Sequence, residues 1–106
     1  MVIEFEKDYL RELYEEGKSS DKKHRYQPSI IKQYKKTIDT LKPFKKIENL
    51  YPVKSLNYEK LSGNKKGIES VRVNDQFRIE FISRIEGVDS DLITICSIVE
   101  LSNHYR

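Results

Sequence analysis

Apolar and polar residues alternate on both sides of a short polar turn in residues 70–81, SVRVNDQFRIEF. Alternation of this kind predicts a β-hairpin. The apolar face of the hairpin would carry Val71, Val73, Phe77, Ile79 and Phe81, and its polar face would carry Ser70, Arg72, Asn74, Arg78 and Glu80. Both arginines are therefore expected on the face that is turned away from the core.

The same alternation predicts the register of the hairpin. Apolar residues should oppose apolar residues, because a slip of one residue moves every side chain to the other face. This condition places Val73 opposite Phe77 and Val71 opposite Ile79. Residues 74–76 then form a three-residue loop, which is a common hairpin connection.

In this register Arg72 lies directly opposite Arg78. Like charges that face each other across two strands destabilise the pairing by up to about 1 kcal/mol. A bound phosphate would supply the missing anion, because guanidinium groups match phosphate geometry. The alternative is that the arginines pair with Glu69, Glu80 or Glu100 and only keep the sheet soluble.

Two segments that precede the hairpin have apolar residues at helical spacing. Apolar residues at intervals of three and four predict a helix over residues 6–16, ended by Gly17, and a second over residues 28–42, ended by Pro43. Pro28 suits the first turn of that second helix. We expect the two helices to form an antiparallel pair.

The remaining strands are predicted from shorter patterns. Residues 2–5 suit a short first strand, and residues 56–61 a strand or extended segment. Residues 83–91 are acidic and predict a turn, whereas residues 92–99 are apolar on both faces and predict a strand inside the sheet. The expected fold is α+β, a single domain over residues 1–106 with two N-terminal helices on one face of a small, mostly antiparallel sheet of three or four strands.

Length and cysteine content narrow the class of protein. A chain of 106 residues forms one domain with a modest core, and no apolar run approaches the roughly 20 residues that span a membrane. No signal peptide is apparent, and the one cysteine, Cys96, fits a reducing compartment. We therefore expect a cytoplasmic protein with no membrane partner, in which Cys96 is a core residue.

Charge is distributed unevenly along the chain. Residues 18–66 contain 14 basic and 4 acidic side chains, a net charge of +10, although the whole chain carries only +3. Such a segment suggests a polyanionic partner. A lysine-rich, solvated helix surface is the plainer alternative.

Candidate chemistry is metal-free. His24 and His104 are far apart with no cysteine pair beside them, and no glycine-rich nucleotide loop is present, so no metal or cofactor is expected. Basic and aromatic residues remain, namely Lys65, Lys66, Arg72, Arg78, His104 and Tyr105. If the strand at residues 92–99 pairs beside residues 77–83, the His104-Tyr105 tail comes within reach of the arginines.

These residue types suit RNA cleavage without metal. The ribose 2′-hydroxyl attacks the adjacent phosphate, a base and an acid transfer protons, and cations stabilise the transition state. Histidine titrates near neutrality and can perform either proton transfer. The alternative for His104 and Tyr105 is an amphipathic tail whose rings cover a sheet edge.

The chain resembles the HigB-type toxins of the RelE/ParE superfamily. The resemblance rests on Leu61-Ser62-Gly63, Lys65-Lys66-Gly67, the segment ESVRVNDQFRI at residues 69–79, and the Ile98-Val99 strand with its His-Tyr tail. It implies a compact α+β fold, ribosome-dependent mRNA cleavage, and neutralisation by an antitoxin.

The resemblance also implies roles for single residues. Arg78 matches the arginine that binds the scissile phosphate, and Arg72 is the neighbouring basic residue in an RVN segment that ends at Asn74. Relatives with a histidine and a lysine before the glycine differ here, where Glu59 and Ser62 stand in those positions. Lys60 or Lys65 would replace the lysine charge, and Lys66 and Asn74 would add RNA contacts.

Proton transfer is assigned to the C-terminal region. Many relatives end in Asp-Tyr-His after the last strand, whereas this chain has Glu100-Leu101-Ser102 there and Asn103-His104-Tyr105 just beyond. His104 and Tyr105 are the best substitutes, and Glu100 would orient one of them.

The implied partners are mRNA, the ribosome and a cognate antitoxin, commonly a HigA-like helix-turn-helix protein for this branch. Because this chain differs from the family pattern at the positions given above, a second hypothesis stays open. In that hypothesis the protein is a non-catalytic module of the same fold that binds RNA or the antitoxin. A gyrase-directed toxin, as in the ParE arm of the superfamily, is a further alternative.

Overall fold

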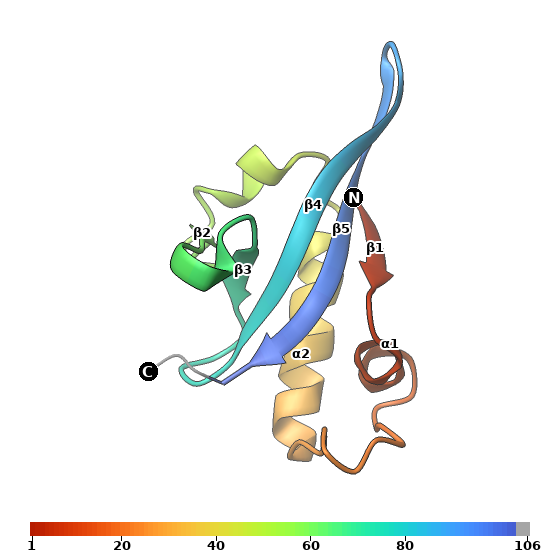
Figure 1. The fold of residues 1–106 in the computed structure, drawn as a ribbon, viewed down its shortest axis with the longest axis vertical. Helices are drawn as coiled ribbons and strands as arrows, with labels where there is room; N and C mark the ends of the chain where they lie inside the picture. Colours follow the sequence, from red (N-terminus) through yellow and green to blue (C-terminus); the bar gives the residue numbers. More distant parts are fainter. Residues whose placement is uncertain (104–106) are drawn as a thin grey trace.

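The computed structural model describes residues 1–103, which form one mixed five-stranded sheet with the strand order β1-β5-β4-β3-β2 (Figure 1). The elements along the chain are β1 (Val2–Phe5), α1 (Asp8–Glu15), α2 (Pro28–Leu41), the 3₁₀ turn η1 (Ile47–Leu50), β2 (Glu59–Lys60), the 3₁₀ turn η2 (Gly63–Lys65), β3 (Glu69–Arg72), β4 (Arg78–Val88) and β5 (Asp91–Ser102).

The α+β class is confirmed, but the prediction of three or four strands is wrong. The first strand, β1, joins the sheet by parallel pairing with the last strand, with Val2 beside Ile95 and Phe5 beside Ile98. All other neighbours are antiparallel. Local alternation carries no information about so distant a pairing, and β2 is only two residues long, so the strand number was underestimated.

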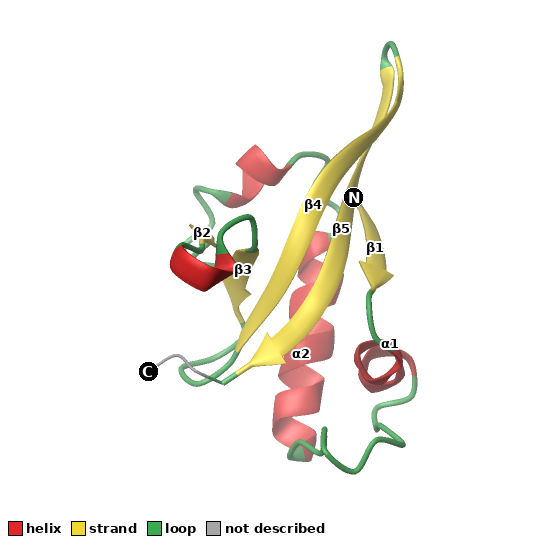
Figure 2. Ribbon diagram, in the orientation of Figure 1, coloured by secondary structure: helices red, strands yellow, loops and turns green. Residues whose placement is uncertain are grey.

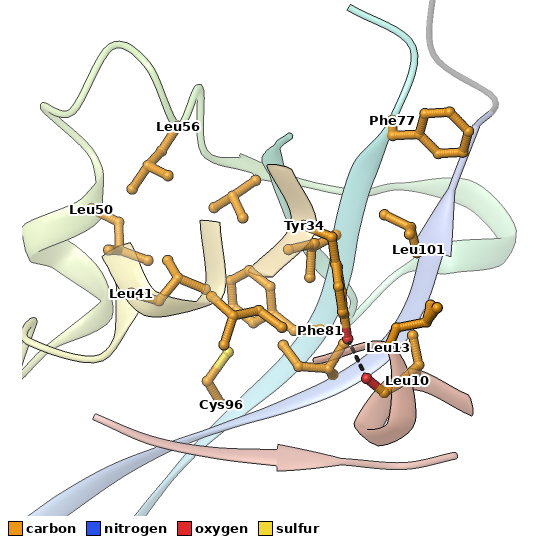
Figure 3. Close-up of a cluster of buried hydrophobic side chains, with 14 of the residues drawn as sticks. Leu10, Leu13, Tyr34, Leu41, Leu50, Leu56, Phe77, Phe81, Cys96 and Leu101 are labelled. Atoms are coloured by element: carbon orange, nitrogen blue, oxygen red, sulfur yellow. Dashed lines mark hydrogen bonds between the residues drawn. The ribbon is translucent and has the colours of Figure 1, made fainter. Parts of the chain in front are cut away.

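The two helices begin and end within two residues of their predicted bounds. Their predicted antiparallel arrangement is wrong, because α1 is seen end-on in Figure 1 whereas α2 runs along the back of the sheet. The Tyr34 hydroxyl on α2 donates a hydrogen bond of 2.8 Å to the carbonyl oxygen of Leu10 on α1 (Figure 3). This bond satisfies a hydroxyl that is buried where the helices cross.

Both helices and one face of the sheet enclose a single core (Figure 3). Helix residues such as Leu13 and Ile38 and sheet residues such as Phe81 and Ile98 have no exposed surface. Cys96 is fully buried among them, and burial raises the pKa of its thiol. Because a nucleophilic cysteine needs an accessible thiolate, Cys96 is a core residue, as expected.

The β3–β4 hairpin has the predicted register. Val71 pairs with Ile79 and Arg72 with Arg78, and the amide of Val73 donates to the carbonyl of Phe77 at 2.9 Å. The loop is closed by its own first residue, because the Asn74 side-chain oxygen accepts bonds of 2.8 Å from the amides of residues 76 and 77. Asparagine commonly stabilises turns in this way.

The β4–β5 hairpin is much longer than predicted. Residues 83–91 were expected to form a turn, yet β4 continues to Val88 and β5 begins at Asp91, so that only Asp89 and Ser90 form the turn. Asp89 has a φ of 56°, which aspartate tolerates better than most residues. The hairpin extends from the body as an arm, residues 82–95, at the top of Figure 1. Beyond Ile95, which still pairs with Val2 of β1, the arm has only two strands.

A β-bulge interrupts β5 where it passes the middle of β4. Phe81 pairs with Ile98, but the preceding residue, Glu80, pairs with Glu100, so Val99 is an extra residue in β5. An extra residue reverses the alternation of the strand. Ile98 and Leu101 therefore both reach the core although they are three residues apart.

Gly87 is required by the geometry of the arm. Its φ is 124°, and a Cβ atom placed there would lie 2.0 Å from the carbonyl oxygen of Asp91. We expect Gly87→Ala to destabilise the arm by about 1–3 kcal/mol through backbone strain and this clash. Amide hydrogen exchange should show lost protection in residues 84–93.

Gly17→Ala is the matched control, because Gly17 has a φ of 73° but no atom within 4 Å of the added Cβ. It should leave the exchange of the arm unchanged. Equal exchange of the arm in both variants would contradict the proposed role of the clash.

Candidate functional site

The candidate site lies on the sheet face opposite the helices. Arg72 and Arg78 are direct neighbours across β3 and β4, as the alternation predicts. In Figure 2, η2 lies in front of β3, whereas α2 lies behind the sheet. We call the layer between the sheet and the residue 57–66 segment the polar layer. Its members are Asn57, Glu59, Lys65, Ser70, Arg72, Arg78, Glu80, Glu100 and Ser102.

Arg78 is buried in this layer, with only 4% of its surface exposed. Its Nε donates to the Ser70 hydroxyl at 3.0 Å, and its Nη2 donates to the carbonyl oxygens of Asn57 and, at 3.3 Å, Ser70. The carboxylate of Glu59 lies 3.8 Å from the same nitrogen. Arginine is rarely buried unless it is paired, and these partners meet that need.

The cover over Arg78 comes from an irregular stretch of chain. Asn57 has a φ of 41°, a conformation that asparagine tolerates better than most residues. The preceding carbonyl, that of Leu56, accepts a bond of 2.7 Å from the amide of Arg72. These contacts attach the segment to the edge of β3 and bring the Asn57 carbonyl to the guanidinium.

Arg72 is in a different environment. Its side chain is 39% exposed, and its Nη2 forms an ion pair with Asp75 in the hairpin loop. Because the Asp75 side chain is 93% exposed, the pair is at the surface. Surface ion pairs contribute only about 0–1 kcal/mol, so an incoming phosphate can replace Asp75 at little cost.

Glu80 is the most deeply buried carboxylate of the described chain, with 1% of its surface exposed. The Lys65 ammonium group lies 2.8 and 3.1 Å from its two oxygens. Glu100 is its direct neighbour on β5, so two carboxylates face each other across the strands. Lys65 therefore supplies the positive charge that two adjacent acids require.

Both arginines have acidic partners that the sequence pattern did not suggest. Arg72 pairs with Asp75 and Arg78 with Glu59. Glu69 instead accepts hydrogen bonds from the Tyr58 hydroxyl at 2.5 Å and from the amide and hydroxyl of Ser83 at 3.0 and 2.6 Å. Burial and the bond to Glu69 both raise the pKa of Tyr58, so its hydroxyl stays protonated.

A pocket of about 310 Å³ opens at the end of β5, beside the polar layer. It is connected to the polar layer through Ser102 in its wall, which pairs with Arg78 across β5 and β4. Burial, followed by the charge of Glu100, raises the pKa of Tyr26 in its wall. Its lining residues are Lys23, Arg25, Tyr26, Phe77, Glu100, Leu101, Ser102 and Asn103.

Within residues 1–103, no group of three or more His, Cys, Asp and Glu side chains is placed to hold a metal ion. The helices of this part of the chain are also too short or too polar to cross a membrane.

Comparison with known proteins identifies the family. The family described as the RelE-like toxin of the type II toxin–antitoxin system HigB matches residues 3–94. The chain belongs to the HigB-like toxins. Toxin HigB-1 of Vibrio cholerae serotype O1 is 35% identical over 83 residues, which cover 76% of this chain and 82% of that protein.

The fold of this HigB-like toxin also has a solved counterpart. A YoeB/ParE toxin from Agrobacterium tumefaciens superposes with a TM-score of 0.52 at 17% sequence identity, over 99% of this chain and all of that one. At this identity the likeness concerns the fold alone, and it agrees with the RelE-like architecture that the sequence implied.

The structure brings some of the predicted site residues together and leaves others apart. Arg72, Arg78, Glu100 and Lys65 share the polar layer, and Lys66 is exposed beside it. Lys60 pairs with Glu69 and therefore lies on the other face of the sheet. The Asn74 amide nitrogen donates to Gln33 on α2 at 2.7 Å, so Asn74 serves the loop. His104 and Tyr105 lie outside the described residues.

Sequence reasoning missed several members of the site. Lys23, Arg25 and Tyr26 stand in a link with no periodicity, and only their basic and aromatic character signalled a role. Asn57, Glu59 and Asp75 were also missed as arginine partners, because nothing local shows which carbonyl or carboxylate a buried guanidinium will meet.

The Lys65–Glu80 pair yields a stability prediction for the toxin. Lys65→Met should lower the free energy of unfolding by about 3 kcal/mol, because it removes the ammonium group that lies 2.8 and 3.1 Å from the buried Glu80 carboxylate. Urea denaturation measures the change, and Glu80→Gln in the same chain should restore most of it.

Lys66→Met is the matched control, since Lys66 is exposed beside the pair. Its effect should stay within about 0.5 kcal/mol, as for most surface substitutions. Similar losses for the two lysine variants would show that the ion pair does not stabilise the fold.

Proposed function

We propose that this HigB-like toxin is a metal-free endoribonuclease that cleaves mRNA on the ribosome and thereby inhibits translation. The observation that carries the proposal is the Arg72–Arg78 pair, two arginines that are direct neighbours across β3 and β4 on the polar face of the sheet. The antitoxin that the family implies would be a HigA-like helix-turn-helix protein.

In the proposed reaction the scissile phosphate binds between Arg72 and Arg78. The ribose 2′-oxygen forms a bond to phosphorus, the bond to the 5′-oxygen breaks, and the products are a 2′,3′-cyclic phosphate and a 5′-hydroxyl. The arginines stabilise the extra negative charge of the transition state. His104 and Tyr105 are assigned the proton transfers, and Glu100 orients one of them.

The surroundings of the arginine pair suit a single-stranded RNA. Lys66 is exposed next to Lys65 of the polar layer and would contact a neighbouring phosphate. The 310 Å³ pocket combines Lys23 and Arg25 with the ring of Tyr26. Aromatic rings beside cations are the usual way in which proteins hold unpaired bases.

A second candidate function is a module that binds RNA or the antitoxin without cleaving. The burial of Arg78 favours it, since a guanidinium that already donates to Ser70 and Asn57 needs a rearrangement before it can hold a phosphate. Such a protein would bind RNA with a salt-dependent affinity and produce no new 5′-ends.

Arg72→Ala tests the first candidate without disturbing the fold, because the Arg72 side chain is partly exposed. Removing one group that stabilises the transition state should reduce cleavage about 100-fold. Growth after induction and primer extension on ribosome-bound mRNA measure the effect. The control is Arg11→Ala, an exposed arginine paired with Glu15 on α1.

Strong cleavage by both variants would exclude the assigned role of Arg72. If the wild-type chain inhibits growth yet leaves mRNA intact, the endonuclease proposal is wrong. Altered DNA supercoiling in those cells would then indicate a gyrase-directed toxin.

Asp75→Asn tests whether phosphate and Asp75 compete for Arg72. The substitution removes a carboxylate charge that an RNA phosphate would have to displace. We expect RNA affinity to rise about 3–10-fold at low salt, which corresponds to the roughly 1 kcal/mol of a surface pair. Fluorescence anisotropy with a labelled single-stranded RNA measures it, and an unchanged affinity would contradict the competition.

A further inference from the structure

The outer part of β4 has a free edge. β3 begins at Glu69, which pairs with Phe81, and within the described residues no strand pairs with residues 82–88 on that side. Beyond Arg84 and Ile95 the arm is a two-stranded ribbon outside the body of the molecule (Figure 2). Isolated two-stranded ribbons are marginally stable in water, and free edges readily pair with other chains.

The polar groups of this edge are oriented outwards. The amide of Ser83 points to the β3 side, where it donates to Glu69 at 3.0 Å. Because hydrogen-bonding directions alternate along an antiparallel strand, the amide and carbonyl of Ile85 point the same way. Ile85 therefore presents one donor and one acceptor to an incoming strand.

The arm is also unusually apolar for an exposed element. The exposed fractions are 43% for Ile82, 68% for Ile85, 73% for Val88, 58% for Leu92 and 51% for Ile93. An element with this many exposed apolar residues is more typical of a protein interface than of a solvated surface.

We propose that this edge pairs with the same edge of a second copy of the chain, antiparallel and related by a two-fold axis at Ile85. A two-fold interface uses the same surface on both copies. The amide of each Ile85 then donates to the carbonyl of Ile85 in the second copy. The proposal does not depend on whether the toxin cleaves RNA.

The charges along β4 select this register. With Ile85 opposite Ile85, Arg84 lies opposite Glu86 of the second copy, twice, and Ile82 lies opposite Val88. A two-fold axis at Arg84 would place that arginine opposite itself, and an axis at Glu86 would place two glutamates opposite each other. Opposite charges stabilise a cross-strand pair and like charges destabilise it.

Arg84 already forms ion pairs within its own chain, with Glu86 at 2.8 Å and Glu4 at 2.9 Å. All three side chains are at least 44% exposed, so these pairs contribute little to stability. Little stability is therefore lost when Arg84 exchanges the Glu86 of its own chain for the Glu86 of the second copy.

A second complementarity lies beside the free edge. A groove of about 790 Å³ there is lined by Lys45, Lys46 and Lys60, among other residues. With Val88 of the second copy beside Ile82, its acidic turn, which contains Asp89 and Asp91, reaches the end of the groove where Glu69 and Ser83 lie. The groove carries Lys45, Lys46, Lys60 and Arg84 against Glu48 and Glu69, so its net charge is positive and attracts the acidic turn. The contact occurs twice in the pair.

Two charge reversals test the pairing. Arg84→Glu places glutamate opposite Glu86 of the second copy, and Glu86→Arg places arginine opposite Arg84. Each variant alone should dimerise at least 10-fold more weakly than wild type. An equimolar mixture of the two restores both opposite-charge pairs and should dimerise like wild type. Sedimentation equilibrium measures the mass against the 12.6 kDa of one chain.

Arg72→Ala is the matched control, because Arg72 lies outside the interface and should leave dimerisation unchanged. Concentration-dependent amide exchange gives a second readout. The amide of Ile85 should gain protection as the dimer forms, whereas that of Thr94, its partner on β5, faces the other edge and should not.

A wild-type chain that remains monomeric at every concentration would overturn the proposal, as would a mixture of the two charge variants that remains monomeric. Protection of Ile85 by an added antitoxin, with no self-association of the toxin, would assign the edge to the antitoxin instead. None of these outcomes depends on RNA cleavage, so failure here is distinguishable from failure of the proposed function.

Discussion

The burial of Arg78 and Glu80 on the sheet face opposite the helices is the constraint on which the rest of the site depends. Ionised groups cannot leave water without partners, so the chain must bring Lys65 to the carboxylate and the Asn57 carbonyl to the guanidinium. The segment that supplies these partners has little regular structure. Its position is held by the charges that it neutralises and by its attachment to the edge of β3. The site is therefore a folded polar layer, and not a set of side chains extending from a flat sheet.

Much of the fold could be predicted from local patterns, because alternation and helical spacing are local properties. The hairpin register followed from the requirement that Val71 oppose Ile79, and the structure confirms it. The parallel pairing of β1 with β5 was missed because its two strands are separated by almost the whole chain. The arm was mistaken for a turn because its acidic residues are exposed on both strands. The partners of the arginines were missed because tertiary contacts place them.

One strand, β4, carries both of the features from which we infer function. Its first residue, Arg78, belongs to the polar layer, and Ile85 lies at the centre of the proposed pairing edge. The two regions are separated along the strand by Phe81, which is fixed in the core. A second copy at the outer end would therefore leave the arginine pair accessible. Self-association and RNA binding are compatible in this geometry.

The extra residue Val99 shows that the number of residues in β5, and not only their identity, decides which side chains face the core. If β5 alternated without interruption, Glu100 would follow Cys96 and Ile98 into the apolar core. The single insertion turns Glu100 outwards beside Glu80. The rest of β5 then follows the reversed alternation. A relative that lacked this one residue, with every side chain otherwise preserved, would direct a carboxylate into its core. Alignments of such chains should therefore be judged by whether they keep the residue count between Cys96 and Glu100.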